Sequence, residues 1–338
     1  MYVNTPRNKV GVLDGDQFRQ VITDYYGEGS SAYNLLGTAN TNWQDEILRT
    51  SVSSDYNLSV GGTYKILPYR IAVSYTNQNG ILKTSAMDRV TASITLNPKF
   101  FDNTLSVTAN VKGFYMHNRF ADEGAIGGAV SFDPSQSVRV DNLPIGNGYF
   151  TWLKPGTDEF IGIAPVNPVS LIDERSMKAD VYRSVGNLQL DYVMPFLPAL
   201  HANLNLGYDV SHSIQHNLMT PDSPLTYKEN KKTGLGQDER LRQLKRNLLL
   251  DFYKQDFESI HSRLDAMAGY SWQRFYKDGG TRTTLMPDKE QWFVSSYTDH
   301  LQLISFFGRV NYTYKDTYLF TVTLRGDATS RFSKDNRW

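Results

Sequence analysis

The chain has 338 residues, and its 35 basic and 35 acidic side chains give a formal net charge of zero. This balance argues against nucleic acid as the main partner, because a phosphate backbone requires a net basic face. The chain has no cysteine, which excludes a disulfide framework, a thiolate metal site and a cysteine nucleophile.

Residues 1–54 are predicted to form a loop decorated with short helices. Asp14 and Asp16 precede apolar residues at helical spacing, which is typical of a capped helix, and Gly27 follows where that pattern stops. A second short helix is expected over Trp43–Arg49. The first nine residues have no apolar core of the signal-peptide kind. We therefore expect either that the protein stays inside the cell or that its N-terminus is missing, and the C-terminus also looks like a cut.

From residue 55 onward the hydrophobic period changes to two, which indicates β-strands. With frayed ends each strand could reach roughly 9–11 residues, which suits a tilted strand crossing a membrane. No run of about 18 apolar residues exists, so no transmembrane helix is expected. About ten strands are predicted, near residues 56–60, 69–76, 89–97, 105–112, 187–192, 200–210, 247–252, 260–266, 308–314 and 318–325.

The two faces of these strands differ in chemistry. One is mostly apolar, and aromatic residues near strand ends suit the girdles of a membrane barrel: Tyr75, Tyr115, Tyr192, Tyr270, Trp272 and Tyr318. A soluble sandwich also alternates, so alternation alone decides little. On the polar face the candidates to line a lumen are Arg89, Lys112, Asp191, Asp209, Arg263, Asp265, Arg309 and Arg325.

Loop lengths favour the membrane barrel. Short connections are expected near 62–68, 98–103, 195–199, 255–259 and 315–317, and longer ones near 77–88, 113–184, 212–243 and 274–302. Strict alternation of short and long connections is typical of an up-and-down barrel with short periplasmic turns and long outer loops. The first strand then runs towards the periplasm, so one upstream strand is expected to be missing and residues 1–54 become an outer loop.

The long loop 113–184 holds the candidate ligand-contacting aromatics Tyr149, Phe150, Trp152 and Phe160. Aromatic faces on a wet loop can stack on sugar rings or grip peptide side chains. Packing of the loop against its neighbours is the alternative, and for any single residue it is the more frequent role.

Little in the sequence suggests an enzyme. There is no G-x-S-x-G motif. His212 and His216 have the spacing of a helical metal pair, but they follow a strand and are interpreted as wet loop residues. Carboxylate pairs such as Asp173 and Glu174 fall in predicted loops and are interpreted as solvated charge. We therefore expect no catalytic residues, no metal site and no cofactor.

Three stretches resemble the SusC/RagA family of TonB-dependent transporters. Residues 41–49 (TNWQDEILR) are similar to the family's T-D/N-W-Q-D-E-I-F-R segment, and 56–62 (YNLSVGG) with 74–81 (SYTNQNGI) resemble a pair of its strands. Residues 308–319 (GRVNYTYKDTYL) with 325–332 (RGDATSRF) resemble a third motif. The departures, at Leu48, Thr317 and the pair 328–329, remove no group that chemistry would need.

The resemblance implies an all-β fold: an antiparallel up-and-down transmembrane barrel of about 22 strands with a plug in its lumen. Residues 55–338 would supply about strands two to eleven, without the plug. The implied function is TonB-dependent active import of a large nutrient, a glycan or an oligopeptide, through the cell outer membrane. The implied partners are a SusD-like surface lipoprotein, the TonB complex acting on the absent plug, and outer-membrane lipid. The alternatives are a soluble secreted β-rich carbohydrate-binding or adhesin module and a passive porin.

Overall fold

The computed structural model describes the chain except residues 142, 144, 222, 226–234, 252–253, 258–260 and 286–289. The α-helices are short and gather in two segments of the sequence: α1 (Gly15–Tyr26) and α2 (Trp43–Ile47) in the first, α3 (Gly124–Ser131) and α4 (Pro168–Asp173) in the second. One 3-10 turn, Tyr33–Leu35, lies in the first segment, and another, Lys334–Asn336, follows the last strand. The strands are β1 (Tyr2–Asn4), β2 (Ser51–Tyr64), β3 (Leu67–Asn79), β4 (Ala86–Leu96), β5 (Lys99–Phe100), β6 (Leu105–Phe120), β7 (Arg175–Val193), β8 (His201–Met219), β9 (Leu235–Asp251), β10 (Lys254–Phe257), β11 (Ser262–Leu285), β12 (Glu290–Tyr314) and β13 (Tyr318–Thr329).

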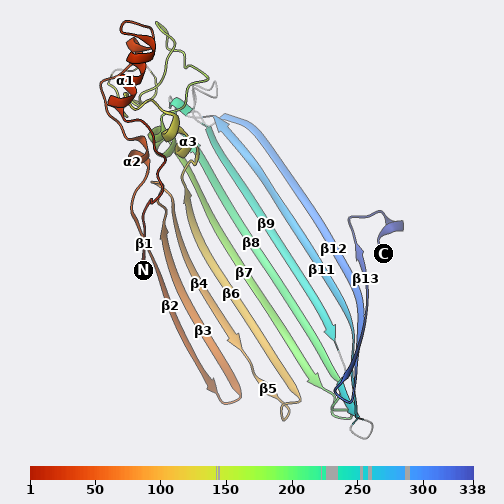
Figure 1. Ribbon diagram of the computed structural model, residues 1–338. Coiled ribbons are helices and arrows are strands. Elements are labelled where there is room, and N and C mark those ends of the chain that lie inside the picture. Colours follow the sequence, from red (N-terminus) through yellow and green to blue (C-terminus); the bar gives the residue numbers. More distant parts are fainter. Residues whose placement is uncertain are drawn as a thin grey trace.

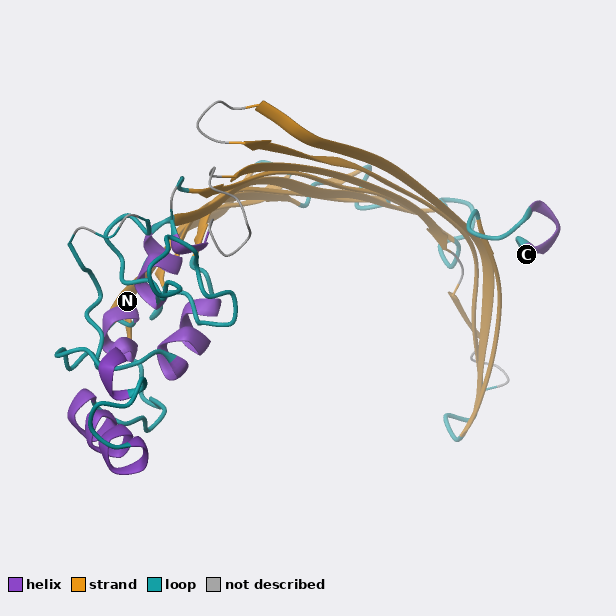
Figure 2. Ribbon diagram, turned by 90° about the horizontal axis from the view of Figure 1, so that it is seen from above, coloured by secondary structure: helices purple, strands orange, loops and turns teal. Residues whose placement is uncertain are grey.

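All of these strands belong to one antiparallel sheet. Its order is β1-β2-β3-β4-β6-β7-β8-β9-β11-β12-β13, with the short β5 and β10 beside β6 and β11, so each long strand lies next to its neighbours in sequence. Figure 1 shows the resulting series of hairpins, all tilted in the same direction. Seen from above, the sheet is an open arc rather than a closed barrel (Figure 2). The predicted up-and-down antiparallel architecture is confirmed in this segment.

The two short helices of the first segment form where the sequence predicts them. The Asp14 side chain accepts a hydrogen bond from the Gln17 backbone N–H at 2.8 Å, and the Gln17 side chain accepts from the Asp14 N–H at 3.1 Å. This reciprocal pair satisfies donors that the first turn of α1 would otherwise leave open. At the other end Gly27, with φ of 82°, stops the helix.

Each of the ten predicted strand regions overlaps one of the long strands, which are longer than expected, and residues 252 and 260 of two predicted regions lie outside the described residues. They range from 11 residues in β4 to 25 in β12. The predicted long connections near 77–88 and 274–302 are therefore wrong, because β3 continues to Asn79 and the β11–β12 pair continues to Leu285 and Glu290. Loop lengths do not alternate strictly. The one very long connection, predicted as 113–184, is residues 121–174.

The pairing register fixes which residues share a face, because directly opposite residues lie on the same side and each strand alternates. Thr76 on β3 is paired with Arg89 on β4, which is paired with Met116 on β6. Followed across the sheet, the register puts all eight candidate lumen residues on one face: Arg89, Lys112, Asp191, Asp209, Arg263, Asp265, Arg309 and Arg325. It puts all six expected girdle residues on the other: Tyr75, Tyr115, Tyr192, Tyr270, Trp272 and Tyr318.

The two faces also differ in exposure. On the apolar face large side chains are open to their surroundings, with Leu58 71% exposed and Leu324 74% exposed. On the polar face even small side chains are enclosed, with Ser305 and Thr313 only 4% and 8% exposed. A curved sheet produces this difference because side chains converge on its concave side and diverge on its convex side. The polar face is thus the inner side of the arc in Figure 2.

Replacing Val60 by Arg tests the apolar face. Val60 is 56% exposed and lies between the upper and lower tyrosines of the β2–β3 hairpin, opposite Ile71. If this face meets hydrocarbon, as the sequence predicts, a cation there should cost the full-length protein about 2–4 kcal/mol of folding stability in phospholipid vesicles. The measurement is denaturant-dependent unfolding followed by tryptophan fluorescence.

The matched control is Ser59→Arg, one residue away on the polar face, which should change the same stability by much less. Equal losses for the two variants would contradict the assignment of faces.

Candidate functional site

The two helical segments come together as a cap over the upper ends of β2 to β8 (Figures 1 and 2). The core of this cap is a cluster of buried apolar side chains drawn from residues far apart in the sequence. Partly buried Phe150, Trp152 and Phe160 pack against it. The buried members are Trp43, Ile47, Leu82, Ala121, Ala125, Ala129, Phe132, Val166, Leu171 and Ile172.

Trp43 joins the first segment to the long connection. It is 2% exposed, and its ring meets that of Phe132 edge to face with centroids 4.6 Å apart. Its indole N–H donates to the backbone carbonyl of Asp133 at 3.0 Å. A large buried ring with a satisfied N–H combines apolar burial with a fixed orientation. Trp43 therefore fixes how residues 121–174 fold over the sheet.

Backbone contacts beside Trp43 reinforce this junction. The backbone N–H groups of Ala39 and Thr41 donate to the carbonyls of Ser135 and Pro134, both at 2.9 Å. Gly37 passes so close that a Cβ atom would lie 2.2 Å from the Ser135 carbonyl oxygen. Only glycine fits at that point without a shift of the backbone. The sequence gives no local signal for this requirement, because the contact spans almost a hundred residues.

The loop aromatics mainly serve the packing of the cap. Phe150 lies edge to face with Trp152, with centroids 5.0 Å apart, and 6.1 Å from Phe132. Phe160 packs against the same cluster. These three rings thus pack against the core of the cap, which is the alternative role that the sequence left open. Trp152 additionally lines a cavity, so it keeps one face available to a ligand.

Tyr149 does not have the exposure that a ligand-contacting residue needs. It is 3% exposed, and its hydroxyl donates to Asp173 at 2.8 Å. The guanidinium of Arg139 lies over its ring at 4.0 Å and reaches its hydroxyl at 2.5 Å. Burial and the Asp173 carboxylate raise the pKa of Tyr149 well above its usual range. This residue is part of the internal framework of the loop.

Glu174 is buried, contrary to the prediction from the sequence. The sequence predicts a solvated loop carboxylate, but the residue is only 9% exposed. Asn147 Nδ2 donates to its carboxylate at 2.7 Å, and Ser170 Oγ donates at 3.0 Å. Burial raises the pKa of Glu174 despite these two donors. The α4 helix turns this side chain inward, and nothing adjacent in the sequence indicates that.

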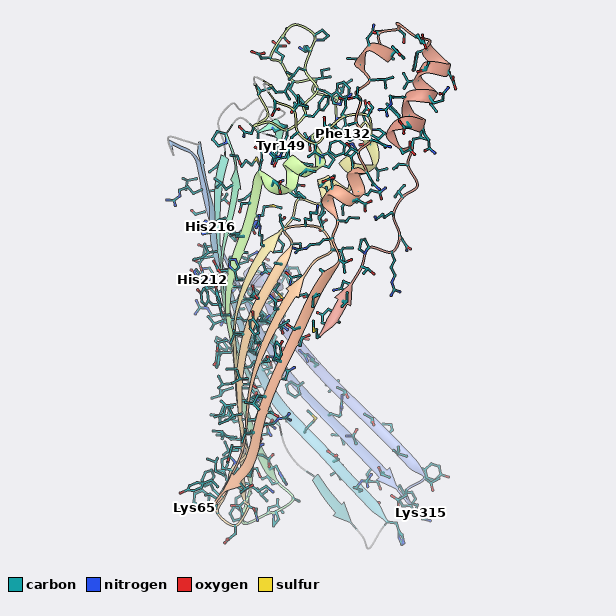
Figure 3. The ribbon with its side chains drawn as sticks, turned by 90° about the vertical axis from the view of Figure 1, so that its left-hand side faces the viewer. Lys65, Phe132, Tyr149, His212, His216 and Lys315 are labelled. Carbon is teal, nitrogen blue, oxygen red and sulfur yellow. The ribbon has the colours of Figure 1, made fainter. Side chains whose placement is uncertain are left out.

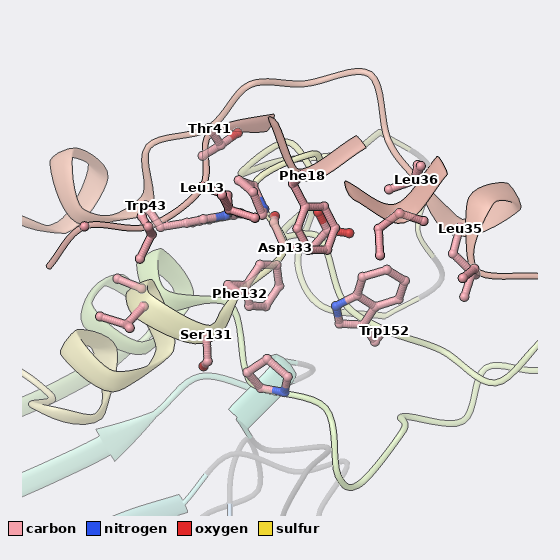
Figure 4. Close-up of a pocket in the computed structure, with 18 residues that line it drawn as sticks. Leu13, Phe18, Leu35, Leu36, Thr41, Trp43, Ser131, Phe132, Asp133 and Trp152 are labelled. Carbon is pink, nitrogen blue, oxygen red and sulfur yellow. Dashed lines mark hydrogen bonds between the residues drawn. The ribbon is translucent and has the colours of Figure 1, made fainter. Parts of the chain in front are cut away.

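The cap contains a cavity of about 630 Å³ between its two segments. The residues that line it include the aromatic side chains of Phe18, Trp43, Phe132 and Trp152. Figure 4 shows Phe18 of α1 facing Phe132 and Trp152 across this space. A second cavity of about 680 Å³ lies where residues 3–7 pass the upper ends of β3, β4 and β6. These hollows are the concave features that a ligand could enter near the cap.

Carboxylates on the polar face of the sheet contact basic side chains. Arg183 forms a bidentate pair with Asp209, at 2.8 Å and 2.6 Å. Arg325 is within 2.9 Å and 3.0 Å of Asp327, and Asp191 lies 3.1 Å from His201. The contacts of Arg183 with Asp209 and of Asp191 with His201 join β7 to β8, whereas Arg325 and Asp327 lie on the same strand, β13. The face therefore presents fixed, hydrated charge of both signs.

The histidine pair lies elsewhere than the sequence interpretation placed it. His212 and His216 are on β8, which continues to Met219, and Figure 3 shows both on the sheet below the cap. Four residues along a strand separate two Cα atoms by about 13 Å, so they cannot share a metal ion. Within the described residues there is no group of three or more His, Asp and Glu side chains suited to a metal.

None of the described helices is both long and apolar enough to span a bilayer.

Comparison with known proteins identifies the family. No model of a protein family matches the chain. The TonB-dependent receptor SusC of Bacteroides thetaiotaomicron is 35% identical over 98% of this chain, which spans 34% of that receptor. The chain belongs to the SusC/RagA family of TonB-dependent receptors. The TonB-dependent receptor P3 of Formosa agariphila is 28% identical over 98% of this chain and is covered to 33%.

A solved structure supports the same fold. The RagAB peptide transporter superposes on 99% of this chain with a TM-score of 0.76 at 15% identity, and 42% of that chain is covered. The chain thus spans about a third of the length of the curated relatives it matches. The family motif at residues 41–49 includes Trp43 and Ile47, both in the core of the cap.

Truncation of Trp43 to Ala tests the junction of the cap. The change removes the ring contact with Phe132 and the hydrogen bond to Asp133, so we expect the cap to lose about 3–5 kcal/mol of local stability. Amide hydrogen exchange of the full-length receptor should rise in residues 33–48 and 121–174 and stay constant in β11 and β12. The matched control is Tyr25→Ala, since Tyr25 is 80% exposed, and exchange that rises equally in both variants would contradict the role of Trp43.

The raised pKa of Glu174 predicts a pH dependence. In the closed cap the Glu174 carboxyl keeps its proton at pH values at which the same carboxyl, in an opened and solvated segment, has already lost it. The cap should therefore be most stable in acid, and its stability should fall as the pH rises above 4.5, the ordinary pKa of a glutamate side chain. Glu174→Gln, which keeps an acceptor for Asn147, should flatten this decline. Hydrogen exchange of residues 145–174 measured between about pH 4 and pH 7 checks it, and an unchanged slope in the variant would refute the assignment.

Proposed function

We propose that this chain forms part of the wall and outer cap of a receptor that imports a large nutrient, a glycan or an oligopeptide, through the outer membrane with energy from TonB. The observation that carries the proposal is the division of one continuous sheet into an apolar face and a polar face. The long tilted strands, the family and the superposition on a peptide transporter support the same conclusion.

The apolar face supports a location in lipid. Among the described residues the apolar side chains extend from β2 to β13, and they include Leu58, Val73, Val310 and Phe320, each more than two-fifths exposed. Soluble proteins rarely expose an apolar patch of that extent. Tyrosines border the band at both levels, as they do where a barrel meets the two membrane interfaces. The band disfavours the alternative of a soluble carbohydrate-binding or adhesin module.

The polar face supports a water-filled lumen. We propose that Arg89, Lys112, Asp191 and Asp209 line it, together with Arg263, Asp265, Arg309 and Arg325. Ion pairs such as Arg183–Asp209 keep this wall charged but internally balanced. A balanced, hydrated wall can hold a plug through polar contacts and still release it, because exposed ion pairs are individually weak.

The cap supports recognition at the outer mouth. Its cavity walls are rich in aromatic side chains, with Phe18, Trp43, Phe132 and Trp152 around one space. Aromatic faces suit sugar rings and apolar peptide side chains equally well, so the cap does not choose between glycan and oligopeptide. Among the four aromatics singled out in the sequence, Trp152 is the one we retain as a ligand contact. The proposed partners are a SusD-like surface lipoprotein that closes over the outer loops and the TonB complex.

The proposed function predicts TonB-dependent uptake by the full-length receptor. The probes are fluorescent oligosaccharides and labelled oligopeptides, both too large for passive diffusion. Deleting the receptor gene should abolish accumulation of one of these two substrate classes. Restoring the gene in a strain without TonB should not restore uptake. The readout is cell-associated label, with receptor abundance in the outer-membrane fraction as the control.

Each other result would overturn part of the proposal. Uptake that persists without TonB would indicate a passive porin. A receptor recovered folded in the soluble fraction without detergent would indicate the secreted module.

A further inference from the structure

Above the upper tyrosines the outward face of the sheet changes from apolar to charged, and its highest pair of opposite residues on β6 and β7 near the cap is basic. Tyr115 on β6 and Tyr182 on β7 are opposite one another, with ring centroids 4.9 Å apart. Four residues higher on the same face, Arg119 on β6 is opposite Lys178 on β7. Four residues along a strand is about 13 Å. Because the strands are tilted, the rise is smaller, so the two cations lie at the level where lipid headgroups begin.

Arg119 and Lys178 are like charges at directly opposite positions of neighbouring strands. Directly opposite side chains have Cβ atoms about 4.5–5.5 Å apart, and like charges in that position destabilise a sheet. On the next strand the register adds His216 beside Lys178, and the position after it on β9 is Asp238. The row is therefore basic on three successive strands before an acidic residue appears.

The nearest described carboxylate on this face is already engaged. Asp180, two residues from Lys178, accepts from the Tyr115 hydroxyl at 2.7 Å and lies 2.8 Å from His117 Nδ1. Within the described part of the chain, neither Arg119 nor Lys178 forms an ion pair, and the buried Arg119 Nε has no hydrogen-bond partner. A guanidinium nitrogen out of water and without an acceptor is costly. An external anion bound between the two side chains would offset their mutual repulsion.

We propose that Arg119 and Lys178 bind the phosphate of a lipid headgroup in the outer leaflet. Arg presents a planar fork suited to phosphate, and Lys adds a mobile point charge. The apolar band directly below would receive the acyl chains of the same lipid, so headgroup and tail sites are continuous on one face. The inference rests on the outward face meeting lipid, which is part of the proposed function.

Native mass spectrometry of the full-length receptor in a neutral detergent tests this assignment. The probes are monophosphoryl lipid A and the same lipid with its phosphate removed, each added in a concentration series. The wild type should bind the phosphorylated lipid more tightly, and Arg119→Gln with Lys178→Gln should weaken that binding about 10- to 30-fold. Binding of the phosphate-free lipid should not change.

The control variant removes two lysines from the opposite ends of the strands. Lys65 and Lys315 lie in turns at the lower edge of the sheet, where Figure 3 marks them. Lys65→Gln with Lys315→Gln removes the same net charge and should leave the preference intact. The single variant Lys178→Gln, at an exposed position, supplies an intermediate loss if the double variant folds poorly.

The possible outcomes distinguish the headgroup site from the lipid-facing location of the sheet on which it depends. Equal affinity of the wild type for both lipids, or a preference that survives the double variant, would overturn the headgroup site while leaving the lipid face in place. Binding of neither lipid would overturn the lipid face itself. Competition by inorganic phosphate at millimolar concentration would reassign the site to free phosphate and overturn the lipid assignment.

Discussion

Backbone pairing is the constraint from which the rest of this structure follows. In hydrocarbon no water satisfies an open N–H or C=O group, so a strand that crosses a bilayer must be paired on both sides. In this chain each long strand lies beside its sequence neighbours in antiparallel register, so every long strand between β2 and β13 has a partner on both edges. Once the register is set, every side chain is assigned to one of two faces, because a slip of one residue would exchange them.

The cap is ordered by side-chain packing and not by strand pairing. Residues 121–174 contain polar backbone without sheet partners, and they gain their order from a small apolar core and from contacts with the first segment. Trp43 and Gly37 supply those contacts through Asp133 and Ser135. Asn167 caps α4 and also donates to the Val138 carbonyl at 2.9 Å. The mouth of the proposed lumen is thus shaped by side chains whose main partners lie far away in sequence.

The outward face changes in character along its height. Its middle is apolar, its borders carry tyrosines, and above the upper border Arg119 stands opposite Lys178. In the proposed function these levels correspond to hydrocarbon, membrane interface and headgroups, and the polar face of the same sheet meets water.

The sequence by itself determined the strand regions, the face of each candidate residue, the capped helix after Asp14 and the family motifs. These features are local: alternation and capping need only residues within a few positions of one another. The lengths of β11 and β12 were not predicted because the alternation of apolar and polar residues disappears in their upper parts, near residues 274–302. Tertiary structure alone decided that Tyr149 and Glu174 are buried and that Arg119 stands opposite Lys178. Their surroundings come from residues far along the chain, and a single sequence does not record which distant segments will meet.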